Sequence, residues 1–138
     1  ILIRGVPGSG KSTLAKDLCF LYNGKGMQAH HFEADQFFTD PVTGDYKFNA
    51  SKLSEAHNLC QSRAFNTLVN HPEDVTIVSN TFTTRGEMRP YIALARNHGH
   101  DIQVIACMST FRNVHNVPDY AIKRMSDRWE EIQLFAEN

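Results

Sequence analysis

The feature of this sequence that most constrains its fold is the segment from Gly5 to Ser12, which matches the pattern G-x-x-x-x-G-K-[ST]. The apolar residues 1–3 before it are expected to end a buried strand, and helically spaced apolar residues after it predict a helix over residues 12–22. Glycines between a strand and a helix let successive backbone N–H groups point inward, and the helix start adds its own unpaired N–H groups. The segment therefore predicts a loop that binds phosphate groups.

Two side chains of this loop have expected chemical roles. The charge of Lys11 is expected to reach the β- and γ-phosphates of a nucleoside triphosphate, and the hydroxyl of Ser12 is a candidate ligand for Mg²⁺. The residues expected to contact the nucleotide are Gly5, Pro7, Gly8, Ser9, Gly10, Lys11, Ser12 and Thr13.

Length and charge bound the class of protein. The chain has 138 residues, which indicates a single domain over residues 1–138. A formal net charge of −1 provides no global basic field for nucleic acid, although a local basic patch would suffice. Because the chain begins at Ile1, inside an expected strand and without an initiator Met, we interpret it as a fragment or a trimmed form of a longer protein.

Cysteine usage and hydropathy bear on the compartment. Cys19, Cys60 and Cys107 form no C-x-x-C motif, and each lies in an apolar-periodic segment, which predicts reduced, buried thiols. The sequence has neither a signal-peptide pattern nor an apolar run long enough to cross a membrane. We therefore expect a cytoplasmic protein without a membrane contact.

The remaining segments alternate between strand and helix patterns. Strands are expected over residues 27–33, 75–79 and 102–107, and helices over residues 51–69, about 84–98 and from Pro118 onward. The tail, residues 130–138, fits either a continued helix or a last strand. The alternation predicts an α/β fold with a mostly parallel sheet and helices on both faces, and in such folds ligands bind at the carboxyl ends of the strands.

Polar residues follow the expected strands at this edge. Asp35 follows the second strand, where its carboxylate is placed to act as general base towards an attacking hydroxyl. The alternatives for Asp35 are the N-cap of a short helix and an indirect contact with the Mg²⁺ shell. Asn80 ends the third strand, where many phosphate-loop proteins carry a metal-holding Asp, and it either bonds a metal-bound water or substrate or forms a turn.

Arg112 follows the fourth strand in a polar segment that has the character of a lid. A mobile arginine that closes over the transferred phosphate would stabilise the charge that develops on its oxygens. The alternative for Arg112 is an ordinary surface residue. His115, in the same segment, is a further lid candidate.

Four stretches together resemble the phosphate-loop kinases related to phage polynucleotide 5′-hydroxyl kinase: Gly5–Thr13, Glu33–Phe38, Ile77–Thr81 and Arg112–Pro118. The chain is more closely similar to an uncharacterised ATP-binding branch of that group, which also has a G-D-Y-x-F segment, here Gly44–Phe48. The resemblance implies a three-layer P-loop kinase fold with ATP and Mg²⁺ as cofactors and with Lys11 and Ser12 as loop residues. It further implies Asp35 as the base acting on a 5′-hydroxyl and Arg112 as a lid arginine.

Two departures from this pattern bear on the acceptor. The polynucleotide kinases carry a basic residue three positions after the catalytic Asp, where it grips the acceptor's phosphate, and this chain has Phe38 there. They also carry an acid where this chain has Asn80. The aromatic residues Phe37, Phe38 and Tyr46 are either stacking partners for a base or core residues.

Three functions are consistent with these observations. The first is an ATP-dependent kinase that phosphorylates the 5′-hydroxyl of RNA or DNA. The second is a kinase for a small molecule such as a nucleoside, a sugar or an antibiotic. It is suggested by Phe38, which replaces the basic residue of the polynucleotide kinases. The third is a non-catalytic nucleotide-binding module of a larger protein, motivated by the chain ends and by the missing strand-three acid. The choice of ATP over GTP rests on the resemblance alone.

Overall fold

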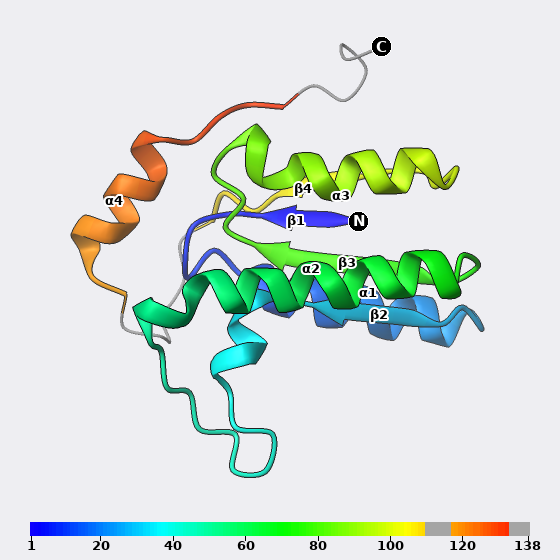
Figure 1. Cartoon of the computed structure of the whole chain (residues 1–138), viewed down its shortest axis with the longest axis horizontal. Coiled ribbons are helices and arrows are strands. Elements are labelled where there is room, and N and C mark those ends of the chain that lie inside the picture. The colour runs from blue at the N-terminus through cyan, green and yellow to red at the C-terminus, as the bar shows by residue number, and fades with distance from the viewer. Residues whose placement is uncertain (110–116, 133–138) are drawn as a thin grey trace.

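The computed structural model describes residues 1–109 and 117–132, and its centre is a four-stranded parallel sheet (Figure 1). The strands lie in the order β2-β3-β1-β4. They are β1 (Leu2–Arg4), β2 (Ala29–Phe32), β3 (Val75–Asn80) and β4 (Val104–Ala106). The helices are α1 (Lys11–Gly24), α2 (Leu53–Asn70), α3 (Arg85–Asn97), α4 (Asp119–Asp127) and the short 3₁₀ helices η1 (Ala34–Phe38) and η2 (Ala50–Lys52).

Side chains of the two central strands alternate between the two faces of the sheet. Leu2 and Val78 belong to the core cluster that contains side chains of α2 and α3. Ile3 and Ile77 lie on the other face, where they pack with residues of α1. Helices therefore cover both faces, and the predicted three-layer α/β fold with a parallel sheet is confirmed.

Most element boundaries shift by one or two residues from the sequence-based expectation, and three segments bear on the site. The second strand ends at Phe32 instead of residue 33, and residues 34–38 form a 3₁₀ helix in which Gln36 Oε1 accepts a hydrogen bond from the Glu33 backbone N–H at 3.3 Å. β4 is short because β1 offers it only three pairing residues. The helix expected from Pro118 onward ends at Asp127, so Trp129 lies beyond it, and the Trp129 ring packs over Arg4.

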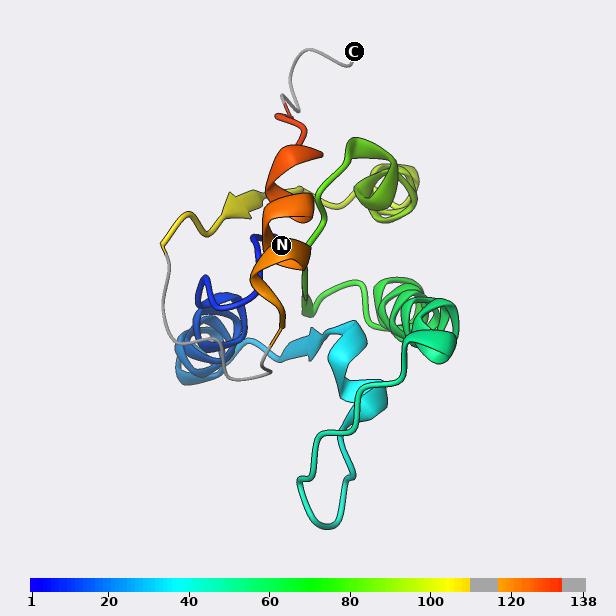
Figure 2. The same cartoon turned by 90° about the vertical axis from the view of Figure 1, so that its left-hand side faces the viewer.

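α4 crosses the carboxyl ends of the strands, and Figures 1 and 2 show it in front of that edge of the sheet. The segment after α4 docks on the connection between β3 and α3: the backbone N–H of Glu130 donates to the carbonyl of Thr83 at 2.8 Å. Nε of Arg128 donates to Oγ1 of the same threonine at 2.9 Å. The expected lid residues Arg112 and His115, and the tail 133–138, lie outside the described residues.

The cysteines and the helices bear on the expected environment. Cys19, Cys60 and Cys107 are all free thiols. Cys60 is buried and the other two are half-buried, so the expected burial is complete only at Cys60. Among the described helices, none combines the length and the apolar character needed to span a bilayer.

A cation, Arg4, has the largest of the fully buried side chains in the described residues, with an exposed fraction of 1%. Its Nε and Nη2 donate to the carbonyl oxygens of Phe82 and Thr83 at 3.0 Å and 3.3 Å. The guanidinium carbon lies 3.7 Å from the centroid of the Trp129 ring. Arg4 therefore ties β1 to the β3–α3 connection and to the segment that follows α4.

We predict that Arg4→Met lowers the free energy of unfolding by about 2 kcal/mol, because the buried carbonyl of Phe82 loses its donor and the carbonyl of Thr83 keeps only the backbone N–H of Glu130. Urea unfolding followed by circular dichroism measures the change. Arg89→Met, an exposed arginine on α3, is the matched control and is expected to stay within about 0.5 kcal/mol of the unmodified chain. Equal stability of the two variants would contradict the structural role of Arg4.

Candidate active site

The backbone of the phosphate loop needs glycine at three positions. Gly8 and Gly10 have φ angles of 82° and 91°, in the left-handed region that favours glycine. A Cβ on Gly5 would stand 2.7 Å from the carbonyl oxygen of Cys107 and would also meet the Ser9 side chain. The loop is thus held in one curled shape at the carboxyl end of β1.

The loop presents polar groups that fit a phosphate. α1 begins at Lys11 with no side-chain cap and no acidic residue in its first turn, so its first N–H groups and positive dipole end are left to an anion. Oγ of Ser9 is buried and has no hydrogen-bond partner within the described residues. Both observations match the donor set that the phosphates of a nucleotide require.

The side chain of Lys11 folds back over the loop, where Nζ donates to the carbonyl oxygen of Val6 at 3.1 Å. Burial lowers the pKa of Lys11, and the negative charges of Asp35 and Glu33 oppose this effect. A phosphate in the loop would add to the opposing charge. Lys11 is therefore a cation whose charged form a bound nucleotide would stabilise.

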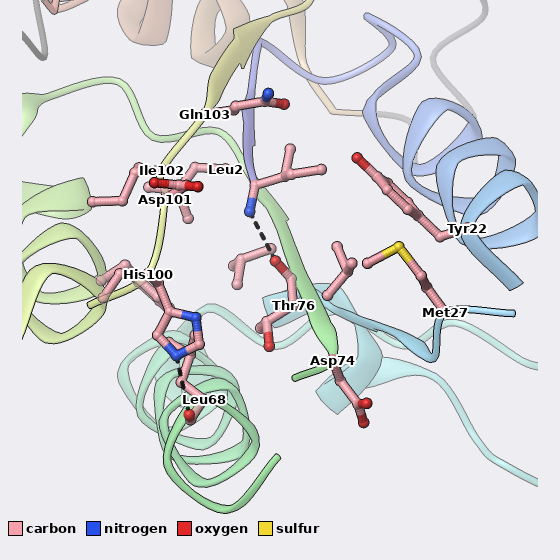
Figure 3. A pocket seen from close by; sticks show the side chains of 15 residues that line it. Leu2, Tyr22, Met27, Leu68, Asp74, Thr76, His100, Asp101, Ile102 and Gln103 are labelled. Atoms are coloured by element: carbon pink, nitrogen blue, oxygen red, sulfur yellow. Dashed lines mark hydrogen bonds between the residues drawn. The ribbon is translucent and has the colours of Figure 1, made fainter. Parts of the chain in front are cut away.

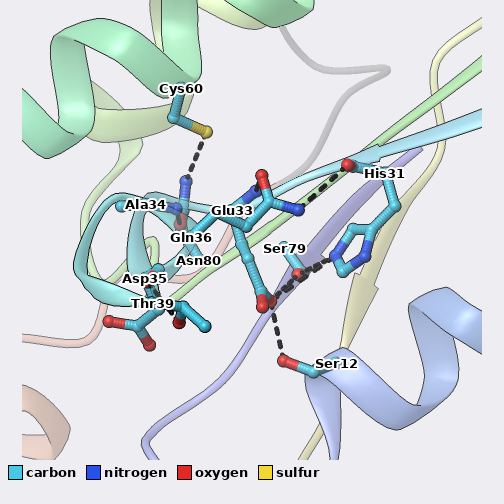
Figure 4. A network of polar contacts seen from close by, with 10 residues as sticks. All are labelled: Ser12, His31, Glu33, Ala34, Asp35, Gln36, Thr39, Cys60, Ser79 and Asn80. Atoms are coloured by element: carbon cyan, nitrogen blue, oxygen red, sulfur yellow. Dashed lines mark hydrogen bonds and ion pairs between the residues drawn. The ribbon is translucent and has the colours of Figure 1, made fainter. Parts of the chain in front are cut away.

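A carboxylate without a role in the sequence-based expectations, that of Glu33, joins three elements beside the loop (Figure 4). Its Oε2 accepts hydrogen bonds from Oγ of Ser12 at 2.7 Å and from Oγ of Ser79 at 2.9 Å. The same oxygen lies 3.5 Å from Nε2 of His31. The end of β3 carries no acid. Glu33 therefore supplies the negative charge beside Ser12, the expected metal ligand. The signal in the sequence is an acid directly after the second strand, two residues before Asp35.

The surroundings of Glu33 keep it ionised. Burial alone would raise its pKa, but hydrogen bonds from His31, Ser12 and Ser79, together with the charge of His31, lower the pKa to about 2. A carboxylate and a hydroxyl are the ligand types that Mg²⁺ accepts, so the pair Ser12 and Glu33 fits this ion.

Asp35, the expected general base, is half-buried in η1 on the same edge of the sheet. Its Oδ1 accepts a hydrogen bond from the hydroxyl of Tyr46 at 3.0 Å. The N-cap of η1 is Glu33, so the alternative of Asp35 as the cap is wrong. Because the charge of Asp35 acts on Lys11, these two side chains share one electrostatic environment.

Asn80 has a structural role instead of facing a metal or a substrate. Its side chain is 7% exposed, and its Oδ1 accepts a hydrogen bond from the backbone N–H of Ala34 at 2.8 Å (Figure 4). Its Nδ2 lies 3.6 Å from Sγ of Cys60 on α2. Asn80 therefore anchors the start of η1, and through it the position of Asp35.

A cavity of about 250 Å³ lies at the opposite, amino ends of the strands (Figure 3). Its lining includes Tyr22, Thr76 and Ile102, and it has no residue of the phosphate loop or of η1. Near this edge, His71, Glu73 and Asp74 place ligand atoms within 4.8 Å of one another, but His71 and Glu73 are exposed. The phosphate-binding chemistry belongs to the carboxyl edge and not to this cavity.

We predict that Glu33→Gln destabilises the chain by on the order of 2 kcal/mol at pH 7. Because the pKa of Glu33 is depressed in the folded state, its stabilisation is present above its ordinary value of 4.5 and is lost as the pH falls towards about 2. Urea unfolding at pH 7, 5, 4 and 3 should show the difference between the variant and the unmodified chain shrinking with acidification. Glu55→Gln, an exposed acid on α2, is the control, and a difference that does not change with pH would refute the assignment.

Comparison with known proteins places these residues in a family. Residues 1–115 match the family model described as an AAA domain. Human NEDD4-binding protein 2 is 30% identical over an alignment of 141 residues that covers 96% of this chain and 8% of that protein. The chain therefore spans less than a tenth of the length of this curated relative.

Solved structures with low identity share the fold. Kti12 from Chaetomium thermophilum, in complex with ADP-AlF3, superposes with a TM-score of 0.71 at 14% identity, covering 99% of this chain and 82% of that chain. APS kinase CysC from Mycobacterium tuberculosis superposes with a TM-score of 0.56 at 16% identity, covering 92% of this chain and 94% of that chain. Since the family model covers most of its length, this chain belongs to the AAA-domain family.

Proposed function

We propose that this chain is an ATP-dependent kinase that transfers the γ-phosphate of ATP to a hydroxyl, and that the acceptor is the 5′-hydroxyl of RNA or DNA. The observation that carries the proposal is the Asp35 carboxylate, which lies on the same sheet edge as the phosphate loop and acts on the charge of Lys11. A carboxylate beside a phosphate-binding loop is the arrangement that phosphoryl transfer to a hydroxyl requires.

The loop has the role of holding and orienting the nucleotide. The uncapped start of α1 and the hydroxyl of Ser9 offer donors to the phosphate oxygens, and Gly5, Gly8 and Gly10 let the backbone approach them. Lys11 moves from the carbonyl of Val6 to the β- and γ-phosphates, where its charge is better compensated. The expected contacts with Pro7 and Thr13 complete the cradle.

Ser12 and Glu33 are the residues that would hold Mg²⁺. When bound, Mg²⁺ neutralises negative charge on the β- and γ-phosphates. Glu33 fixes the direction of the Ser12 hydroxyl through the hydrogen bond between them, and Ser79 and His31 fix Glu33 in turn. In this proposal the network takes the place of the strand-three acid, whose absence was one of the two motives for a non-catalytic module.

Asp35 accepts the proton of the acceptor hydroxyl as the hydroxyl oxygen forms its bond to the γ-phosphorus and ADP leaves. Arg112 is proposed as the lid cation that meets the developing charge on the phosphate oxygens. The 5′-hydroxyl acceptor is supported by the resemblance of four ordered stretches to polynucleotide kinases, which covers nearly the whole chain.

A small-molecule acceptor is the second candidate, and one observation favours it. Phe38 stands where the polynucleotide kinases carry the basic residue that binds the acceptor's phosphate. It is 6% exposed and belongs to the core cluster. The chain therefore lacks that particular contact to an acceptor phosphate. A nucleoside or a sugar, which carries no phosphate, would not need it.

A transfer assay tests the proposal. The chain is given Mg²⁺ and ATP labelled at the γ-phosphate, with a 5′-hydroxyl RNA oligonucleotide, the DNA equivalent, or a panel of nucleosides and sugars. We expect label on an oligonucleotide, a loss of at least 100-fold in Lys11→Ala and Asp35→Asn, and unchanged transfer in the matched variants Lys16→Ala and Asp45→Asn, which change exposed residues of the same types.

The other outcomes decide between the candidates. Label only on a nucleoside or a sugar would replace the polynucleotide acceptor with a small molecule. Tight nucleotide binding without transfer to any acceptor would overturn the kinase proposal. Full transfer by Asp35→Asn would show that Asp35 is not the general base, while the kinase proposal itself would stand.

A further inference from the structure

Residues 39–48 leave the body of the fold between η1 and η2 and return to it, forming the loop at the bottom of Figure 1. The loop has internal order: the backbone N–H of Asp40 donates to the carbonyl of Asp45 at 2.8 Å, and that of Gly44 donates to the carbonyl of Asp40 at 2.9 Å. A bridge joins Thr39 to Tyr46 in antiparallel fashion. The loop therefore presents its returning arm, residues 46–48, to η1 in a defined position.

The first group on this arm is the Tyr46 hydroxyl, which donates to Oδ1 of Asp35 at 3.0 Å. Burial, followed by the charge of Asp35, raises the pKa of Tyr46 well above its usual range. The hydroxyl therefore stays protonated in neutral solution, and as a donor to Oδ1 it restrains the direction in which the Asp35 carboxylate points. Tyr46 does this from a sequence position eleven residues away.

The second group is aromatic. The buried Phe38 ring contacts three other rings edge-on, with centroid distances of 5.2 Å to Phe37, 6.3 Å to Tyr46 and 5.1 Å to Phe48. Phe37 and Phe48 are 36% and 54% exposed. These two rings pack on Phe38 and keep part of their apolar surface in water, and a flat partner stacked on them would cover that surface.

We propose that the returning arm of this loop recognises the acceptor, with Tyr46 positioning the Asp35 carboxylate and the exposed Phe48 ring stacking on the base of the acceptor's terminal nucleotide. The proposal rests on the proposed function, which it deepens by naming how the acceptor is held. Tyr46 is a positioning residue, because it acts on the acceptor hydroxyl through Asp35. Phe48 is a specificity residue, because its contact is with the base.

The chemistry of this surface favours a base over a charged group. Phe38 occupies the position of the phosphate-gripping residue and serves as the common support for Tyr46 and Phe48. In this proposal, aromatic contacts with the acceptor's base take the place of an ionic contact with the acceptor's phosphate. Every base has a flat π-face, so stacking on Phe48 tolerates different bases and holds a nucleotide without reading its sequence.

Two variants separate the two roles. Tyr46→Phe keeps the ring that packs on Phe38 and removes only the hydroxyl, so we expect kcat to fall about 10-fold with the KM for ATP unchanged. Phe48→Ala removes the stacking ring, so we expect the KM for a 5′-hydroxyl oligonucleotide to rise about 10-fold, with no change for the same oligonucleotide lacking its terminal base. Val42→Ala, at the 91% exposed loop tip, is the matched control and should change neither constant.

A binding measurement makes the test independent of turnover. An oligonucleotide with 2-aminopurine as its 5′-terminal base loses fluorescence when that base stacks, so its fluorescence should fall on the unmodified chain and on Val42→Ala but not on Phe48→Ala. Phe48→Leu, which keeps an apolar side chain without a π-face, should behave as Phe48→Ala. Thermal unfolding of each variant shows that the fold is retained.

The outcomes distinguish this inference from the proposed function. If the unmodified chain moves no phosphate to any acceptor, the proposed function fails and this inference fails with it. If the unmodified chain is active but Tyr46→Phe keeps its kcat, Tyr46 does not position Asp35. If Phe48→Ala retains both the KM and the quenching, the acceptor base binds elsewhere and the recognition role is overturned.

Discussion

The carboxylate of Glu33 is the interaction on which the rest of this site depends. It joins the start of α1 to the ends of β2 and β3 through Ser12, His31 and Ser79, at the edge where parallel strands present their carboxyl ends. Removing any one partner would leave a partly buried charge with fewer polar contacts, which is costly where water is partly excluded. The network therefore fixes the relative positions of the phosphate loop and η1, and so of Lys11 and Asp35.

The same edge of the sheet is also stabilised by residues that have a structural role and no proposed part in the reaction. Arg4 fastens β1 to the β3–α3 connection and to Trp129, and Asn80 fastens the start of η1 through Ala34. Buried polar groups of this kind are satisfied as a set, so they favour one arrangement of the loops over its alternatives. The candidate chemistry lies on a frame whose polar residues are committed to structure.

The sequence predicted the sheet, the layers and the loop because each depends on local pattern. Apolar alternation, helical spacing and the glycines around Lys11 are visible within a window of a dozen residues. The roles of Glu33, Arg4 and Asn80 were not predictable in that way, because each depends on partners far along the chain: 46 residues separate Ser79 from Glu33 and 78 separate Phe82 from Arg4. A short polar side chain at a strand end looks the same in sequence whether it faces a substrate or a backbone amide.

The central claim is that one edge of the sheet brings together the phosphate loop, the two residues that would hold Mg²⁺ and the general base for phosphoryl transfer. A crystal structure with Mg²⁺, a non-hydrolysable ATP analogue and a 5′-hydroxyl dinucleotide tests it most directly. We predict that Lys11 Nζ leaves the carbonyl of Val6 for the phosphates, that the ion lies at Ser12 beside Glu33, and that the acceptor hydroxyl lies within hydrogen-bond distance of Asp35. Phosphates bound outside the loop, or an acceptor hydroxyl remote from Asp35, would contradict the account.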